Sequence, residues 1–490
     1  MLSINQTTKK TRRPIKILQY GEGNFLRAFA DSMVDVANEK GIFCGNVQIV
    51  KPIAAGDLEA FRAQDCMYTV LLRGQEDGEA REEKRIVTSI AGVSDPYEDY
   101  EEYASHARLP DLRIIISNTT EAGIIFDETD CFDLKPPGSF PGKLTKLLYE
   151  RYRFYGGSPE KGVIILPVEL IDKNGETLRD YCLKLAALWG LPGEFVSWLS
   201  GHCIFCNTLV DRIVTGYPEK EADFLEKEFG YTDRLMTTGE LFGLWVIESE
   251  NPELINAEFP LDKIGLPVIF TADLRPYREL KVRILNGAHT ASVLAAYLSG
   301  LDTVGELTND KTMRRYLERV VFGELAPTVP LPIAEVRQYA DSVIGRFENP
   351  FVVHSLLAIA LNSVSKFKVR ILPGIIKTLE DKGRLPELLC FSLAALMVFY
   401  SGVFSTGGKL TASRNGALYE IIDDPAVLAF FAGSRTLAPN LFVSAFLSRT
   451  DFWDTDLTKI SGLADIVTED LQIIHKHGMR AAVEKMLSLT

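Results

Sequence analysis

The stretch Ile15-Lys-Ile-Leu-Gln-Tyr20-Gly21-Glu-Gly23-Asn24-Phe25 decides the fold of the first half of the chain. Ile15 to Tyr20 predicts a short buried strand, and the amphipathic segment that follows predicts a helix from Leu26 to Lys40. Strand, glycine turn and helix open a dinucleotide-binding unit, because glycines let the backbone approach a pyrophosphate and the helix N-terminus favours its charge. The candidate cofactor-binding residues of this segment are Gly21, Gly23, Asn24, Phe25 and Arg27, the last of which could instead be a surface residue.

Two parts of the usual dinucleotide fingerprint are missing. Leu26 stands where a third glycine is expected, so helix and strand cannot pack as closely there. After a second predicted strand, Asn46 to Val50, Lys51 stands in the region where an acidic residue would hold a ribose 2′-hydroxyl. The residues alone therefore leave the choice between NAD and NADP open.

A further buried strand, Leu112 to Ser117, is followed by Asn118-Thr119-Thr120-Glu121. Ligands of open α/β sheets lie at the carboxyl ends of strands, so we expect Asn118 and Thr119 to contact the cofactor. The alternative is an ordinary helix cap formed by Thr and Glu. Met67 to Arg73 and Arg85 to Ile90 predict two β segments, with a charged loop between them.

The segment His202 to Arg212 offers several polar groups, among them Asn207 and Asp211. Cys203 and Cys206 form a C-x-x-C without a second pair, which favours two core-facing thiols over a zinc site. The sequence also lacks an H-E-x-x-H motif, so no metal site is predicted.

After Asp273 the pattern changes from strands to helix-length segments, including Tyr277 to Leu298 and Val352 to Val364. We predict an α/β Rossmann-type dinucleotide-binding domain over residues 1–275 and a mainly α-helical substrate and catalytic domain over residues 276–490. The apolar run Leu388 to Phe404 is marginal for a membrane span, and a buried helix is favoured.

Three polar residues share one flank of the helix predicted from Tyr277 to Leu298. At about 100° per residue, with Lys281 at zero, His289 falls at roughly 80° and Asn286 at roughly 140°. Apolar residues surround them. One flank of the helix thus carries an amine that can lose a proton, an amide and an imidazole. This combination suits a site that acts on a carbonyl group. Taken singly, a lysine is usually a solvated helix residue and a histidine is more often a core residue than a catalyst.

Composition excludes several classes of protein. The chain has 490 residues, 46% of them hydrophobic, so it can bury large cores. Its net charge of -13 argues against nucleic acid or an anionic membrane as the main partner. Seven dispersed cysteines and a polar segment from Met1 to Arg13 predict a reduced, cytoplasmic protein without a secretory signal. The sequence does not predict an oligomeric state.

The motifs together resemble a known family. Four segments resemble the mannitol dehydrogenase family of long-chain, metal-independent polyol dehydrogenases. They are Gly21-Glu-Gly-Asn-Phe-Leu-Arg27-Ala, Asn118-Thr-Thr-Glu121, the run Asn207 to Pro218, and Lys281-x4-Asn286-x2-His289. The resemblance spans nearly the whole chain, including Arg346 to Pro350. Within the family, Leu285 to Ala291 with Gly300 to Glu306 is most similar to members that act on sugar acids.

The resemblance implies hydride transfer between NAD(H) and the carbonyl carbon of an open-chain sugar acid. Lys281 would donate or accept the proton, a role that burial suits because desolvation lowers the pKa of a lysine. Asn286 and Asn207 would hydrogen-bond the developing alkoxide, and His289 the same oxygen or a neighbouring hydroxyl. Asp211 and Glu121 are expected near the substrate, Glu121 as a proton relay or hydroxyl ligand.

One departure from the family pattern concerns substrate choice. Mannitol dehydrogenases have an acidic residue three positions before the catalytic lysine, and here that position is Arg278. Since arginine pairs bidentately with carboxylates, Arg278 with Lys366 would select a sugar acid over a neutral polyol. One alternative is an enzyme of the same family that acts on an epimeric keto-uronate or a neutral ketose. The other is an NAD(H)-binding regulator without activity. The complete set of catalytic residue types argues against the regulator.

Overall fold

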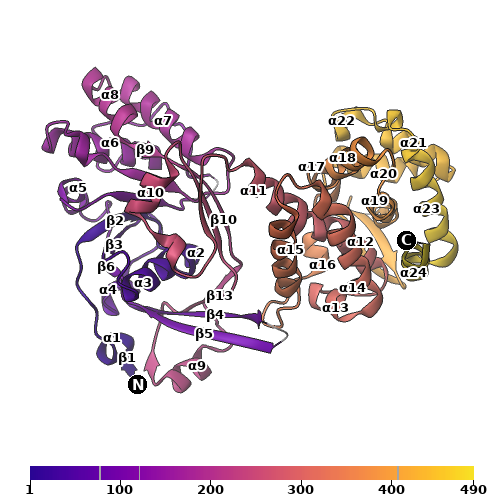
Figure 1. The fold of residues 1–490 in the computed structure, drawn as a ribbon, viewed down its shortest axis with the longest axis horizontal. Helices are drawn as coiled ribbons and strands as arrows, with labels where there is room; N and C mark the ends of the chain where they lie inside the picture. The colour runs from indigo at the N-terminus through magenta and orange to yellow at the C-terminus, as the bar shows by residue number, and fades with distance from the viewer. Residues whose placement is uncertain (77–78, 121, 406–407, 490) are drawn as a thin grey trace. The chain divides into compact units, whose positions relative to one another are not determined.

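A six-stranded parallel sheet forms the centre of the first half of the protein in this computed structural model, which describes residues 1–76, 79–120, 122–405 and 408–489 (Figure 1). The strands lie in the order β6-β3-β2-β7-β8-β9, and every neighbouring pair is parallel. Their bounds are β2 Ile15–Tyr20, β3 Asn46–Val50, β6 Ile90–Ser94, β7 Ile114–Ser117, β8 Ile164–Pro167 and β9 Ile204–Phe205. The order reverses between β2 and β7, which is the point at which Rossmann folds bind dinucleotides.

The sheet is buried on both faces. Successive residues of a strand point to opposite faces, so Ile114 and Ile116 enter one hydrophobic core and Ile115 the other. The first core contains one continuous helix made of α2 (Asn24–Leu26), a π-helical turn η1 (Arg27–Asp31) and α3 (Ser32–Glu39). The second contains α6 (Phe140–Phe154), α7 (Asn174–Leu188) and α8 (Gly193–His202).

Two smaller sheets complete this half. One has the order β10-β14-β15, with bounds Asn207–Asp211, Leu244–Glu248 and Val268–Thr271. The other has the order β11-β13-β4-β5, with bounds Val214–Gly216, Thr237–Glu240, Tyr68–Glu76 and Glu79–Val87. The charged loop predicted between the two β segments is therefore wrong. Of that loop, residues 74–76 belong to β4 and residues 79–84 to β5, an edge strand whose charged side chains face solvent.

The remaining strands and α-helices of this half are short. They are β1 (Leu2–Ser3), α1 (Ile4–Thr7), α4 (Glu59–Ala63), α5 (Tyr100–Ser105), α9 (Ala222–Phe229), β12 (Tyr231–Thr232) and α10 (Pro252–Glu258).

The second half is mainly helical. Its helices are α11 (Arg275–Leu280), the π-helical turn η5 (Lys281–Asn286), α12 (Gly287–Leu298), α13 (Val304–Asn309), α14 (Lys311–Glu318), the π-helical turn η6 (Arg319–Leu325), α15 (Ile333–Phe347), α16 (Leu356–Ile359), α17 (Ser363–Arg370), α18 (Leu372–Lys382), α19 (Glu387–Phe399), α20 (Pro425–Ser434), α21 (Pro439–Leu447), α22 (Thr450–Trp453), α23 (Leu463–His477) and α24 (Met479–Leu489). A small antiparallel sheet, β16-β17-β18, also lies here, with bounds Val403–Phe404, Leu410–Arg414 and Ala417–Glu420. The predicted fold class, Rossmann-type α/β followed by a mainly helical part, is confirmed.

Two predictions about this half have different outcomes. The single helix predicted from Val352 to Val364 is wrong, because Asn362 has a left-handed φ of 55° that separates α16 from α17. The apolar run after Glu387 forms α19, whose side chains are almost all buried. No helix among the described residues is long and apolar enough to cross a membrane.

The chain divides into two compact units. The first consists of Met1–Gly74 and Arg81–Leu274, and the second of Gln75–Ala80 and Arg275–Thr490.

Candidate functional site

The candidate cofactor residues of the first unit centre on Gly21, directly after β2. Its N–H donates to Val50 O (3.1 Å) and its φ is 126°. A Cβ at this position would lie 2.9 Å from Asn118 O and 3.1 Å from Leu26 Cδ1. Only glycine fits this backbone and this space. Gly21 therefore lets the turn after β2 lie against the turn after β7, at the place where the strand order reverses.

The Asn118-Thr119 turn is held by Glu169, which no sequence motif pointed to. Thr119 donates from both its N–H and its Oγ1 to Glu169 Oε1 (2.9 Å each), and Ser117 Oγ donates to Glu169 Oε2 (3.1 Å). Burial raises the pKa of the Glu169 carboxyl. The side chain of Thr119 thus faces Glu169. Glu169 follows the carboxyl end of β8, a position that could have identified it.

Arg27 lies inside the protein rather than on its surface. Its guanidinium donates to Leu235 O and to Asn24 Oδ1 (2.7 Å), and it lies 5.5 Å from the ring centroid of Tyr68. The surface alternative for Arg27 is therefore wrong. Phe25 stacks on Phe29 with ring centroids 5.0 Å apart, whereas Gly23 is exposed, and a Cβ there would have no neighbouring atom within 4 Å.

Lys51, the residue found in place of the expected acid, forms a buried ion pair. Its Nζ lies 2.8 Å from Asp95 Oδ2, and the two side chains are 4% and 3% exposed. Asp95 follows β6, the strand next to β3. The positive charge of Lys51 is thus balanced within the protein. The glycine cradle at Gly21, which has no room for a Cβ, fits a bound dinucleotide.

Asn207, the first residue of β10, is fixed by two carboxylates. Its Nδ2 donates to Glu248 Oε2 (2.7 Å) and to Glu176 Oε1 (3.0 Å), while its Oδ1 accepts from the Glu176 N–H (3.1 Å). Glu248 Oε1 in turn accepts from the N–H of Leu274 (2.8 Å), the last residue of the first unit. Asp211 ends the same strand and is buried.

In the second unit, Lys281 to Asn286 form a π-helical turn rather than part of a regular α-helix. The N–H of Gly287 donates to the carbonyl of Val282, five residues back. Because a π turn holds more residues than an α turn, each residue advances by less than about 100°. The predicted angle of Asn286 relative to Lys281 is therefore wrong, and the turn brings their directions closer. π turns of this kind occur frequently at functional sites.

His289 is buried on α12, one turn after Asn286. Its ring stacks on Phe347 with centroids 4.3 Å apart and meets His354 edge-on at 5.4 Å. Burial, followed by the charges of His354, Arg346, Arg370 and Lys366, lowers the pKa of His289 well below its ordinary value. The ring is therefore neutral near pH 7, and its Nε2 is buried without a hydrogen-bond partner among the described residues.

The candidate substrate residues lie on different elements. Arg278 lies on α11 and is half-buried, and Lys366 lies on α17, where its Nζ donates to Ile359 O (2.9 Å). Glu121 lies outside the described residues.

The two cysteines of the C-x-x-C motif are both buried, and burial raises the pKa of each to about 12. Within the described ranges, no group of three or more His, Cys, Asp or Glu could hold a metal ion.

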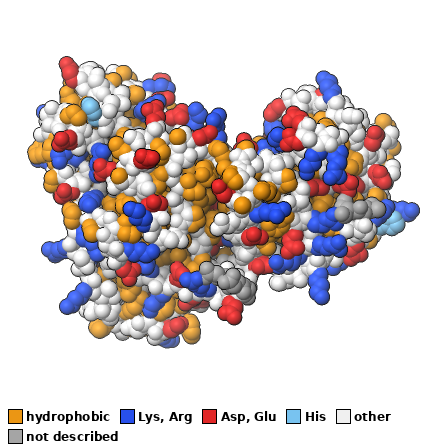
Figure 2. Space-filling model, viewed as in Figure 1, with side chains coloured by type: hydrophobic (Ala, Val, Ile, Leu, Met, Phe, Trp, Pro, Cys, Tyr) orange, Lys and Arg blue, Asp and Glu red, His pale blue; other side chains and the backbone are white. Residues whose placement is uncertain are grey.

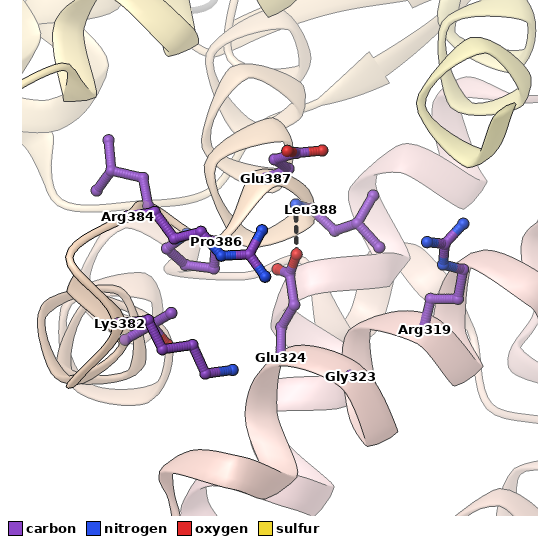
Figure 3. Close-up of a pocket in the computed structure, with 10 residues that line it drawn as sticks. Arg319, Gly323, Glu324, Lys382, Arg384, Pro386, Glu387 and Leu388 are labelled. Atoms are coloured by element: carbon purple, nitrogen blue, oxygen red, sulfur yellow. Dashed lines mark hydrogen bonds between the residues drawn. The ribbon is translucent and has the colours of Figure 1, made fainter. Parts of the chain in front are cut away.

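A pocket in the second unit contains none of the predicted site residues. It lies where η6, the end of α18 and the start of α19 meet, and its lining includes Arg319, Lys382 and Arg384 (Figure 3). Glu324 occupies the N-terminus of α19, because its carboxylate accepts hydrogen bonds from the N–H groups of Leu388 (3.0 Å) and Leu389 (2.8 Å). The start of α19 is thus capped by the protein itself.

Surface charge is mixed on the face shown in Figure 2. Lys and Arg side chains are interspersed there with Asp and Glu side chains over both units. This face of the described residues therefore offers no extended area of one charge sign.

Comparison with known proteins assigns the class and then the family. Residues 15–262 match the mannitol dehydrogenase Rossmann domain and residues 273–475 match the mannitol dehydrogenase C-terminal domain. The protein is thus a dehydrogenase with a dinucleotide-binding domain. It belongs to the mannitol dehydrogenase family.

The curated relatives are similar over almost their whole length. The chain is 43% identical to the altronate oxidoreductase of Enterobacter sp. (strain 638) over 480 residues, covering 96% of this chain and 97% of that protein. It is 44% identical to the altronate oxidoreductase of Cronobacter sakazakii (strain ATCC BAA-894) over 477 residues, covering 96% of each.

Solved structures share the fold. D-sorbitol dehydrogenase in substrate-free form matches with a TM-score of 0.79 at 23% identity, covering 99% of this chain and 100% of that chain. Pseudomonas fluorescens mannitol 2-dehydrogenase in complex with NAD and D-mannitol matches with a TM-score of 0.65 at 22% identity, covering 97% and 95%.

Proposed function

We propose that the enzyme interconverts D-tagaturonate and D-altronate with NAD(H) as cofactor. The observation that carries this proposal is the identity of 43% to 44% to altronate oxidoreductases over 96% of the chain. The residue types that the reaction needs are all present. Bound nicotinamide would supply or accept the hydride at the carbonyl carbon.

Lys281 is the proposed general acid and base. In the direction of reduction its ammonium donates a proton to the oxygen of the carbonyl group, and in oxidation its amine removes that proton from the hydroxyl. Asn286 follows at the end of the same π turn, and Asn207 is the second amide proposed to bind the developing alkoxide. Asn207 must then release one of its two carboxylate acceptors.

His289 is proposed to bind the same oxygen or a neighbouring hydroxyl. Its neutral ring keeps one N–H donor and one acceptor, so it can bind a hydroxyl without adding charge to the site. Arg278 and Lys366 are the proposed ligands of the substrate carboxylate, and Asp211 a ligand of its hydroxyls. The proposed cofactor site consists of Gly21, Gly23, Asn24, Phe25, Arg27, Asn118 and Thr119.

The Lys51–Asp95 ion pair supports NAD over NADP. A 2′-phosphate binds to uncompensated cations, and the charge of Lys51 is already balanced at 2.8 Å.

One assay tests the proposal. The full chain is mixed with NADH and, in separate cuvettes, with D-tagaturonate, D-fructuronate and D-fructose, while NADH absorbance is followed. The proposal expects fastest oxidation of NADH with D-tagaturonate. Faster turnover of D-fructuronate or D-fructose would identify the protein as a fructuronate reductase or mannitol 2-dehydrogenase instead. NADH binding without turnover of any of them would point to a regulator.

A further inference from the structure

Helix α17 packs against both segments that carry the proposed catalytic residues of the second unit, η5 and α12. Lys366 and Arg370 are four residues apart on α17, so they project from the same face of the helix. Arg370 Nη1 donates to the Oγ1 of Thr290 at 3.3 Å. Thr290 directly follows His289, so the guanidinium of Arg370 lies next to the proposed catalytic helix turn.

The positive charges of Lys366 and Arg370 are not balanced by a bonded carboxylate among the described residues. Both side chains are half-buried, and their hydrogen bonds go to neutral oxygens, those of Ile359 and Thr290. Asp423, whose charge acts on Lys366, uses its Oδ2 to accept from the Val364 N–H (3.3 Å) and from the Tyr400 hydroxyl. Partly burying two cations without an anion is unfavourable, so an anionic ligand would stabilise this face of α17.

We propose that Arg370, together with Lys366, binds the carboxylate of the sugar-acid substrate beside His289, and that Arg370 is a specificity-determining residue of the enzyme. This inference rests on the proposed function, since it assigns the acid group of that substrate. A guanidinium has five N–H donors, and one of them is held by Thr290. The donors that remain can form two parallel hydrogen bonds to a carboxylate, which a neutral hydroxymethyl group cannot accept in the same way.

The same arrangement explains how an acidic protein attracts an acidic substrate. The net charge of -13 repels an anion at a distance. Near His289, Lys366 and Arg370 supply positive charge that no bonded carboxylate among the described residues offsets. A bound carboxylate would offset these charges, while the neutral imidazole adds none.

The first experiment measures kcat and KM of Arg370→Gln, Arg370→Lys and the wild type with D-tagaturonate and with D-fructose. Arg370→Gln is expected to raise KM for the keto-uronate by about 10- to 100-fold, the loss expected for charge-assisted hydrogen bonds, with little change for the neutral ketose. Arg370→Lys is expected to recover part of the affinity, because it restores charge without the planar pair of donors. Lys368→Gln is the matched control, since Lys368 lies on the same helix but pairs with Asp454 at 3.0 Å.

The second experiment separates this inference from the proposed function by measuring binding alone. The full chain is titrated calorimetrically with sodium D-gluconate and with D-sorbitol, which differ by the carboxylate. We expect the wild type to bind gluconate more tightly than sorbitol and Arg370→Gln to lose that preference. If the wild type binds gluconate in this way but fails to reduce any keto-uronate, the proposed function is wrong and the carboxylate site stands. Identical gluconate binding by the wild type and Arg370→Gln, including no binding by either, would overturn the inference.

Discussion

Asn207 and Glu248 are direct cross-strand neighbours on β10 and β14, and Asn207 Nδ2 donates to Glu248 Oε2 at 2.7 Å. The other carboxylate oxygen of Glu248 accepts the N–H of Leu274. One carboxylate thus joins the proposed oxyanion-binding amide to the residue that precedes α11. We infer that Glu248 is a positioning residue for Asn207.

Replacing Glu248 by Gln should reduce kcat by about 10-fold, whereas Asn207→Ala should reduce it by about 100- to 1000-fold, as the loss of one oxyanion donor does. A glutamine has only one accepting oxygen for the two donors, Asn207 Nδ2 and Leu274 N, so one of the two hydrogen bonds is lost. Steady-state turnover of the keto-uronate measures both. The exposed Glu250→Gln serves as control, and an unchanged kcat in Glu248→Gln would contradict the positioning role.

Lys281→Ala should lower kcat by about 100- to 10,000-fold, because it removes the proposed proton donor. NADH affinity, measured by fluorescence titration, should stay the same, since the candidate cofactor residues lie in the other unit. The exposed Lys311→Ala controls for loss of one positive charge from this unit. Turnover near the wild-type rate would refute the role of Lys281.

Arg278→Glu should lower the ratio of keto-uronate to D-fructose turnover by at least about 10-fold, because a carboxylate at this position repels the acid group of the substrate. Parallel measurements of kcat/KM for the two substrates give the ratio. Arg315→Glu, an exposed change of the same charge on α14, is the control. A ratio equal to that of the wild type would show that Arg278 takes no part in substrate choice.

Asp95→Asn should shift cofactor preference toward NADPH by about 10-fold in kcat/KM, because it removes the charge that balances Lys51 while keeping an oxygen acceptor. The Oδ1 atom of Asp95 also accepts the Tyr97 N–H at 2.9 Å, which asparagine preserves. Comparing NADH and NADPH for both proteins measures the shift. The double variant Lys51→Met with Asp95→Asn should lose this shift toward NADPH. If the double variant kept the shift, Lys51 would not be its cause.

The burial of His289 predicts that the folded state loses stability as pH falls. Burial and the nearby cations lower the pKa of His289 well below 6.5, so below that pH the unfolded state binds a proton that the folded state does not. The contribution of this group to the free energy of unfolding is therefore smaller at pH 5.5 than at pH 7.5. Urea-unfolding midpoints at the two pH values should therefore differ less in His289→Gln than in the wild type. The exposed His477→Gln should retain the full difference, and equal differences in all three would contradict the prediction.

Local patterns in the sequence were enough to predict much of the fold. Ile15 to Phe25 specifies strand, turn and helix because alternation, glycine conformation and helical periodicity all act between close neighbours in the chain. The same holds for the helix predicted from Tyr277 to Leu298, which the structure shows as α11, η5 and α12. The π turn inside it was not predictable from a regular 100° step, since it depends on one additional residue between bonded backbone groups.

The sequence by itself determined the two kinds of fold, because short-range periodicity specifies them, and its resemblance to the mannitol dehydrogenase family pointed to the candidate residues. Only the tertiary structure decided what these residues touch. Lys51 meets Asp95 across 44 residues, Asn207 meets Glu248 across 41, and Arg370 meets Thr290 across 80. The order of strands and the packing of helices bring these groups together, and neither is written in the local pattern of any one segment.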